Sequence, residues 1–227
     1  MKNLFLCAIY TILFPIFIYA NPLDCSKQIG MIIIDPAHGG IDPGATASHM
    51  IVDQQIILLE KEITLYVAEN LRRQLIDLFP DVNVIMTRER DVFMSLEERM
   101  KIANSVNLGE DKISVFISIH VNYSFNKNNS GYEIWVKNDL TQNSEDLIIA
   151  EKLSNEFANI FGETLSLRGI KPNDFFLLRN VNIPALIIEL GFLSNNDDVI
   201  LLSSDDGIYK YASALSRGIE TYIEALE

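Results

Sequence analysis

Residues 31–44 read Met-Ile-Ile-Ile-Asp-Pro-Ala-His-Gly-Gly-Ile-Asp-Pro-Gly, a short apolar run that ends in a turn-rich segment. An apolar run of this length closed by an Asp-Pro pair is typical of a buried β-strand that leads into a loop. His38 comes two residues after this pair and is followed by Gly39 and Gly40. Because open α/β sheets bind their ligands at the carboxyl ends of the strands, we expect the imidazole of His38 to lie at such an edge.

Apolar runs of strand composition alternate with amphipathic helical segments along the rest of the chain. Further strands are expected at residues 81–86, 113–119, 131–136, 175–178 and 184–190. Helices are expected at residues 59–79, 95–106 and 144–161, and from about residue 206 onward. The alternation predicts an α/β fold, a single domain with a mixed, mostly parallel sheet of about six strands flanked by helices on both faces.

The composition is that of a globular protein, with 227 residues, 48% hydrophobic and 22% charged. This length suits one domain with a substantial core. The formal net charge of −13 argues against binding to nucleic acid, and against docking on anionic lipid, because both need basic patches.

The first twenty residues differ from the rest, since Lys2 is followed by an uncharged apolar stretch that reaches residue 20. Residues 1–20 are predicted to be a signal peptide, with a retained N-terminal anchor as the alternative. Residues 21–29 are then expected to form a leader and residues 30–227 the folded domain. We therefore expect an exported protein of the periplasm or cell envelope, with no stable membrane insertion after cleavage.

Two of the three histidines follow expected apolar strands. His38 comes after the run at residues 31–34, and His120 comes after the run at residues 113–119. A core imidazole with a backbone partner is the simpler interpretation of either histidine alone. Two equivalent positions favour a shared site. His49 lies in a turn-rich segment without such a setting, and we expect it on the surface.

Glu60 lies three residues before Ile63 and therefore shares the apolar stripe of the helix at residues 59–79. A buried carboxylate is costly unless it is paired or coordinated. Glu62 lies about 200° further round the helix and should face solvent. The alternative for Glu60 is a carboxylate that complements the N-terminal end of the helix dipole.

Glu189 stands alone as an acid in an otherwise apolar strand, Ala-Leu-Ile-Ile-Glu-Leu-Gly-Phe. A structural role would need a distant partner such as Arg88, Arg99 or Arg179. The favoured interpretation is a carboxylate positioned for proton transfer, with its pKa raised by desolvation.

Two histidines and one carboxylate give a tetrahedral Zn²⁺ three ligands and leave the fourth position for water. The bound water then has a pKa of about 7, and a second, non-ligating glutamate can accept its proton. The residues therefore predict metal-assisted hydrolysis of an amide or ester.

Several segments, taken in chain order, resemble motifs of the zinc-dependent N-acetylmuramoyl-L-alanine amidases of the AmiA/AmiB/AmiC kind, the amidase type 3 family. They are residues 35–45, 60–65, 87–88, 95–104, 118–122 and 189–195. The resemblance implies that His38, Glu60 and His120 bind one Zn²⁺ per chain and that Glu189 is the catalytic acid/base. It further implies a substrate, peptidoglycan or its muropeptides, cleaved at the amide between N-acetylmuramic acid and L-alanine of the stem peptide.

Three differences from the family pattern affect these expectations. Ala37 stands where the family usually has a glycine. We expect alanine to be tolerated there if the backbone at this position does not adopt the left-handed, positive-φ conformation. The span from His38 to Glu60 is longer than usual. The segment from Asn122 to Pro184 is too short for the inhibitory helix of some members, so we expect an open site that needs no activator protein. The remaining alternatives are a non-catalytic wall-binding module and a zinc peptidase or deacetylase.

Overall fold

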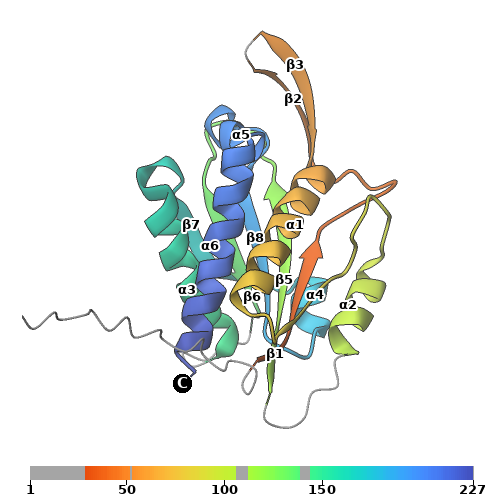
Figure 1. Cartoon of the computed structure of the whole chain (residues 1–227). Coiled ribbons are helices and arrows are strands. Elements are labelled where there is room, and N and C mark those ends of the chain that lie inside the picture. Colours follow the sequence, from red (N-terminus) through yellow and green to blue (C-terminus); the bar gives the residue numbers. More distant parts are fainter. Residues whose placement is uncertain (1–28, 52, 106–111, 139–143, 227) are drawn as a thin grey trace, which may run out of the picture.

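The computed structural model describes residues 29–51, 53–105, 112–138 and 144–226 (Figure 1). The predicted signal peptide, residues 1–20, and the leader as far as residue 28 lie outside the described residues. Within the described part of the chain, no helix is both long enough and apolar enough to cross a membrane.

The described residues form a six-stranded sheet in the order β4-β1-β5-β8-β6-β7. Strands β4, β1, β5 and β8 are parallel, β6 runs antiparallel to β8, and β7 is parallel to β6. The predicted α/β class with a mixed, mostly parallel sheet is thus confirmed. The strand bounds are β1 Ile29–Pro36, β4 Asn83–Met86, β5 Ile113–Asn122, β6 Tyr132–Val136, β7 Leu167–Pro172 and β8 Ala185–Phe192.

Helices cover both faces of the sheet, as expected. One face packs against α1 (Glu60–Leu78), α3 (Glu145–Phe161) and α6 (Asp205–Glu224), whose apolar stripes form the larger core. The other face packs against α2 (Leu96–Asn104) and α4 (Phe176–Asn180) in a smaller core. A short helix, α5 (Asn196–Leu202), and the 3₁₀ turn Gly162–Thr164 complete the described helical elements. The helix α2 opens with a capping box, since Ser95 and Glu98 bond each other's backbone amides.

The prediction of a strand at residues 175–178 is wrong, because this segment begins α4 and the sixth strand is β7 instead. Leu177 and Leu178 are adjacent and both buried in the smaller core, which a short helix allows. A strand would send them to opposite faces of the sheet. β7 has little apolar pattern because it is an edge strand, bonded on one side to β6 and mostly exposed.

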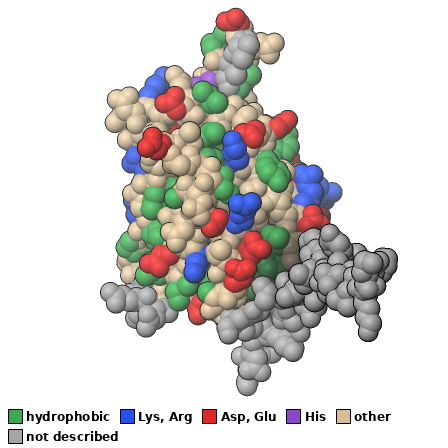
Figure 2. All heavy atoms as spheres, turned by 60° about the vertical axis from the view of Figure 1, so that its left-hand side comes forward, with side chains coloured by type: hydrophobic (Ala, Val, Ile, Leu, Met, Phe, Trp, Pro, Cys, Tyr) green, Lys and Arg blue, Asp and Glu red, His purple; other side chains and the backbone are tan. Residues whose placement is uncertain are grey.

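A β-hairpin that the sequence did not predict joins the loop after β1 to α1. Its strands are β2 (Thr46–Ile51) and β3 (Gln54–Leu59), paired antiparallel. The hairpin stands clear of the body above the carboxyl end of the central strands (Figure 1), and Figure 2 shows it projecting above a face on which acidic and basic side chains are interspersed. His49 lies on β2, half-buried, and its Nε2 is 2.7 Å from the carbonyl oxygen of Leu193. It was expected in an exposed turn; it instead anchors the hairpin to the loop after β8.

Candidate active site

The parallel strands β1, β5 and β8 deliver the predicted site residues to one edge of the sheet. Asp35 and Pro36 at the end of β1 pair with Ser118 and Ile119 of β5, so His38 emerges near the end of β5. His120 pairs directly with Glu189 of β8. The parallel register alone therefore brings the segments of both histidines and of Glu189 together.

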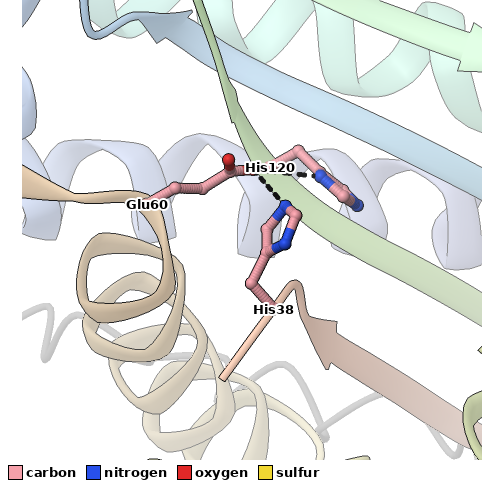
Figure 3. Close-up of side chains that lie close together, drawn as sticks. All are labelled: His38, Glu60 and His120. Atoms are coloured by element: carbon pink, nitrogen blue, oxygen red, sulfur yellow. Dashed lines mark hydrogen bonds and ion pairs between the residues drawn. The ribbon is translucent and has the colours of Figure 1, made fainter. Parts of the chain in front are cut away.

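His38, Glu60 and His120 form a cluster whose potential ligand atoms all lie within 4.8 Å of one another. Glu60 Oε1 is 3.2 Å from His38 Nε2 and 3.1 Å from His120 Nδ1 (Figure 3). The three side chains come from the loop after β1, the first turn of α1 and the end of β5. Two imidazole nitrogens and one carboxylate oxygen facing a common point are a donor set that fits Zn²⁺ and leaves one position for water.

Glu60 is held by the backbone on either side of the cluster. Its Oε2 accepts the amide of Ala45 at 2.7 Å, and its Oε1 accepts that of Val121 at 3.0 Å. The residue is 3% exposed, whereas Glu62 is exposed as predicted. Glu60 is also the first residue of α1, so the N-terminus of the helix favours its negative charge as well. The carboxylate is therefore both buried with partners and placed to complement the helix dipole.

Gly44 leaves the space that the cluster needs. Its φ is +66°, and a Cβ built there would lie 2.5 Å from Glu60 Oε2 and 2.6 Å from the His38 ring. Any side chain would therefore displace a carboxylate or an imidazole that faces the metal position.

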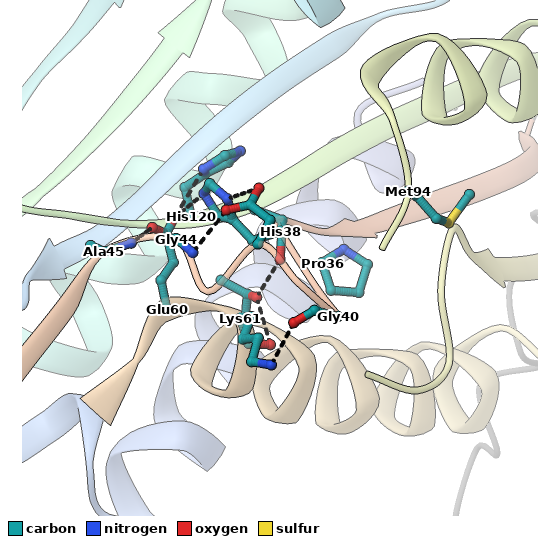
Figure 4. A network of polar contacts seen from close by, with 12 residues as sticks. Pro36, His38, Gly40, Gly44, Ala45, Glu60, Lys61, Met94 and His120 are labelled. Atoms are coloured by element: carbon teal, nitrogen blue, oxygen red, sulfur yellow. Dashed lines mark hydrogen bonds and ion pairs between the residues drawn. The ribbon is translucent and has the colours of Figure 1, made fainter. Parts of the chain in front are cut away.

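His38 adopts a left-handed backbone conformation, with φ 59°, which few non-glycine residues adopt. Its Nδ1 is 2.7 Å from Asp42 Oδ2, so Nε2 is directed toward Glu60 (Figure 4). A carboxylate on the second nitrogen of a metal-binding histidine fixes its tautomer and orientation. Sequence reasoning missed Asp42, although its position four residues after His38 within the same turn was a usable signal. Ala37 is buried and lies outside the left-handed region, as its substitution for glycine requires.

Two buried arginines hold the strained loop by its carbonyl groups. Arg88 donates to the carbonyls of Pro36, Ala37 and Lys61 at 2.9, 2.8 and 2.7 Å. Arg99 donates to the carbonyl of His38 at 2.6 Å and forms an ion pair with Asp35.

The buried ion pair with Asp35 is completed by two hydroxyls, since Thr87 Oγ1 and Ser118 Oγ donate to that carboxylate at 2.6 and 2.7 Å. Arg179 pairs with Asp174 at 2.8 Å. Across the described ranges, therefore, none of the three arginines considered as partners of Glu189 forms an ion pair with it.

Among the described residues, therefore, no cationic side chain forms an ion pair with Glu189. Its Oε2 is buried and has no hydrogen-bond partner among the described residues. Burial raises the pKa of Glu189 to about 7; the charge of His120 opposes this rise, and the carboxylates of Glu60 and Glu133 add to it. A carboxyl group with such a pKa can exchange a proton near neutrality.

The mutual attraction between Glu60 and the two histidines favours protonated imidazoles and an ionised carboxylate. Burial would lower the pKa of His38, but Glu60 and Asp42 outweigh it and raise that pKa to about 9. Burial opposes the ionised form of Glu60, yet His120 and His38 hold its pKa well below the ordinary range. A cation at this point would replace the proton charge that the carboxylate now attracts.

The motif at residues 189–195 also has a structural role. Asn195 caps α5 by accepting the amides of Asp197 and Asp198, and Asp198 in turn accepts the amides of Phe192 and Gly131. The end of β8, which carries Glu189, is thereby tied to the start of β6.

Known proteins with similar sequences include cell-wall amidases. The chain is 29% identical to the protein YqiI of Bacillus subtilis over 98% of its own length and 97% of that protein. It is 33% identical to the sporulation-specific N-acetylmuramoyl-L-alanine amidase of the same organism, over 83% of this chain and 66% of that enzyme.

Similar solved structures include the N-acetylmuramoyl-L-alanine amidase AmiC2 of Nostoc punctiforme, with a TM-score of 0.72 and 28% identity over 86% of this chain and 97% of that one. Another is the CwlD amidase of Clostridioides difficile, solved in complex with the GerS lipoprotein, with a TM-score of 0.72 and 29% identity over 86% and 99% of the two chains. The family model for N-acetylmuramoyl-L-alanine amidase, Amidase_3, matches residues 32–221. A match over most of the chain, together with this fold, shows that the protein belongs to the amidase type 3 family of N-acetylmuramoyl-L-alanine amidases.

Proposed function

We propose that this protein is a zinc-dependent hydrolase that cleaves the amide between N-acetylmuramic acid and L-alanine of the peptidoglycan stem peptide. The observation that carries the proposal is the cluster of His38, Glu60 and His120 near Glu189, a half-buried acid whose buried Oε2 has no hydrogen-bond partner among the described residues. Membership of the amidase family supplies the substrate class.

His38, Glu60 and His120 would hold one Zn²⁺ ion. When bound, the ion supplies Lewis-acid polarisation of the scissile carbonyl and activation of the attacking water. Asp42 accepts a hydrogen bond from the Nδ1–H of His38, so that Nε2 would be the nitrogen that binds the ion. The backbone amides of Ala45 and Val121 keep the Glu60 carboxylate from turning away.

Glu189 is proposed to accept a proton from the attacking water and to deliver it to the leaving amine of L-alanine. A pKa of about 7 suits both transfers, because the group is neither too weak a base nor too weak an acid near neutral pH. Its pairing with His120 on the neighbouring strand, outside the three-residue cluster, supports this role over that of a ligand.

We further propose that the protein is exported and acts in the cell envelope without an obligatory activator. The side chains of His38 and His120 are 25% and 24% exposed, so the described residues leave the cluster open to substrate. The CwlD neighbour was solved with a lipoprotein, and a comparable partner of this chain would modulate the site rather than uncover it.

Product analysis of purified, zinc-loaded protein with muropeptides tests the function. We expect release of intact stem peptides that carry a new free amine on L-alanine, detected by mass spectrometry. Loss of a peptide bond or an acetyl group with the sugar–peptide link intact would instead identify a zinc peptidase or a deacetylase. No reaction with any muropeptide, despite bound zinc, would point to a wall-binding module.

Substitution of Glu189 by Gln tests whether this residue acts as a general acid/base or as a metal ligand. We expect the Glu189→Gln variant to retain zinc in a metal-content assay and to lose turnover by a factor of about 100 or more. Loss of the metal in this variant would mean that Glu189 is a ligand and that its assigned role is wrong.

A further inference from the structure

A row of charged side chains crosses the sheet from the metal cluster toward its edge. His120 of β5 pairs with Glu189 of β8, and Glu189 pairs in turn with Glu133 of β6. Directly opposed residues on neighbouring strands point to the same face of a sheet. The next strand, β7, carries Arg168 and Lys171.

Glu133 holds both of these cations on a single oxygen. Its Oε1 accepts Arg168 Nε at 2.7 Å and Lys171 Nζ at 2.8 Å. The carboxylate side chain is 5% exposed, but those of Arg168 and Lys171 are 32% and 33% exposed. Glu133 alone therefore does not balance the charge of the two cations, and both of them remain partly exposed to solvent.

Aromatic rings fix the direction of both cationic side chains. The Arg168 guanidinium lies 4.9 Å from the centroid of the Phe192 ring, and Lys171 Nζ lies 5.2 Å from that of Trp135. Contacts of this kind hold a cation in place while part of its hydrogen-bonding capacity remains free. The cationic pair, Arg168 and Lys171, is therefore preorganised by Glu133 and the two rings.

Charge neutralisation of Glu133 does not explain this arrangement, because a single cation would suffice for it. The chain has a formal net charge of −13, so two fixed and partly exposed cations on one carboxylate are unusual for its composition. Arginine and lysine held in this way match an anionic group such as a carboxylate.

We propose that the cationic pair binds a free carboxylate on the second residue of the stem peptide. The inference rests on the proposed function and adds a determinant of specificity to it. Glu189 protonates the leaving amine and lies between the metal cluster and the cationic pair, so the leaving peptide extends along the row toward β7.

The spacing of the strands supports the second residue as the one recognised. β7 lies two strands beyond β8, which is about 10 Å at the usual strand separation. Two extended residues span about 7 Å, and the arginine and lysine side chains cover the remaining distance.

Two matched substrates test the proposal, muropeptides that carry either a free carboxylate or a carboxamide on the second stem residue and are otherwise identical. Zinc-loaded wild-type protein should cleave the carboxylate form with a kcat/KM about 10-fold or more higher, mainly through a lower KM. The Arg168→Gln and Lys171→Gln variants should each lose most of this preference, with KM for the carboxylate form rising more than kcat falls. The conservative variant Lys171→Arg should show the carboxylate preference that Lys171→Gln loses.

Arg179→Gln is the matched control, because Arg179 is an exposed arginine whose ion-pair partner is Asp174 and not Glu133. It should retain the full preference. Melting temperature and zinc content of each variant show whether it folds, and the wild-type comparison of the two substrates needs no variant at all.

The outcomes separate this inference from the proposed function. Equal cleavage of both substrates by the wild type overturns the inference and leaves the amidase function intact. An equal loss of kcat/KM for both substrates in Arg168→Gln and Lys171→Gln would show a structural role for the pair and would also overturn it. Failure of the wild type to cleave either substrate contradicts the proposed function itself.

Discussion

At the scale of single residues, the site depends on carboxylates whose surroundings differ sharply. Glu60 accepts two backbone amides and faces two imidazoles, so its charge is stabilised. Glu189 lies one strand away, with a buried oxygen that no described group satisfies, and its charge is disfavoured. This difference in pKa between the two carboxyl groups supports the proposed roles, in which Glu60 holds a cation and Glu189 moves a proton.

The contrast between Glu60 and Glu62 gives a direct test of the ligand set. Glu60→Ala should lose most of the bound zinc, because it removes one of three ligands, while Glu62→Ala should bind one zinc per chain as the wild type does. Metal analysis of both purified variants after dialysis decides this. Equal zinc content in the two variants would contradict the assignment of Glu60.

The raised pKa of Glu189 predicts a pH-dependent cost in stability for the metal-free protein. The carboxyl titrates near 4.5 when unfolded and at about 7 when folded, so the folded state holds its proton longer. The contribution of Glu189 to the free energy of unfolding is then most favourable below pH 4.5 and falls as the pH rises to about 7. Over that window the wild type should lose on the order of 2 to 3 kcal/mol relative to Glu189→Gln, which has no such proton to lose.

Urea unfolding of both chelator-treated proteins at pH 5 and pH 8 measures this difference. The Glu189→Gln variant should be the more stable of the two at pH 8. An unchanged difference in unfolding free energy between the two pH values would mean that Glu189 titrates normally.

At the scale of elements, the strained turn after β1 is positioned by α2 and by the segment after β4. Arg99 of α2 bonds the carbonyl of His38 and the carboxylate of Asp35, and Arg88 after β4 bonds neighbouring carbonyls. These contacts explain why a positive φ at His38 persists, since the surrounding structure holds the loop at several points.

Removal of the Arg99 side chain should therefore be severely destabilising. Arg99→Ala leaves Asp35 charged, buried and without its arginine, which typically costs about 3 to 5 kcal/mol in the free energy of unfolding. Arg179→Ala breaks an exposed pair with Asp174 and should cost about 1 kcal/mol or less. Denaturant unfolding of the two variants makes the comparison, and similar losses would argue against a structural role for the buried pair.

At the scale of the whole molecule, four segments far apart in sequence meet at the proposed zinc site. The loop after β1, the start of α1 and the ends of β5 and β8 meet where His38, Glu60, His120 and Glu189 lie. An ion that binds the folded state and not the unfolded chain stabilises the entire domain through these segments.

Chelation should consequently lower both activity and the melting temperature, and added Zn²⁺ should restore both. At a free zinc concentration 100 times the dissociation constant, the stabilisation is about 2.7 kcal/mol. Scanning calorimetry with and without chelator measures the shift, and Mg²⁺ serves as the control because imidazole ligands suit it poorly. A melting temperature that zinc leaves unchanged would contradict a metal site in this cluster.

By itself, the sequence determined the fold class, the convergence of His38, His120 and Glu189, and the burial of Glu60. Each of these follows from local pattern, because apolar strands and an apolar helix stripe can be read from residue types alone. Tertiary structure alone decided the rest. The projecting hairpin, the edge strand β7 and the helix α4 have weak or ambiguous periodicity, and the contacts of Glu133 and the two buried arginines depend on loop geometry and cross-strand register. Such contacts join residues up to 64 positions apart, and no local pattern encodes a separation of that kind.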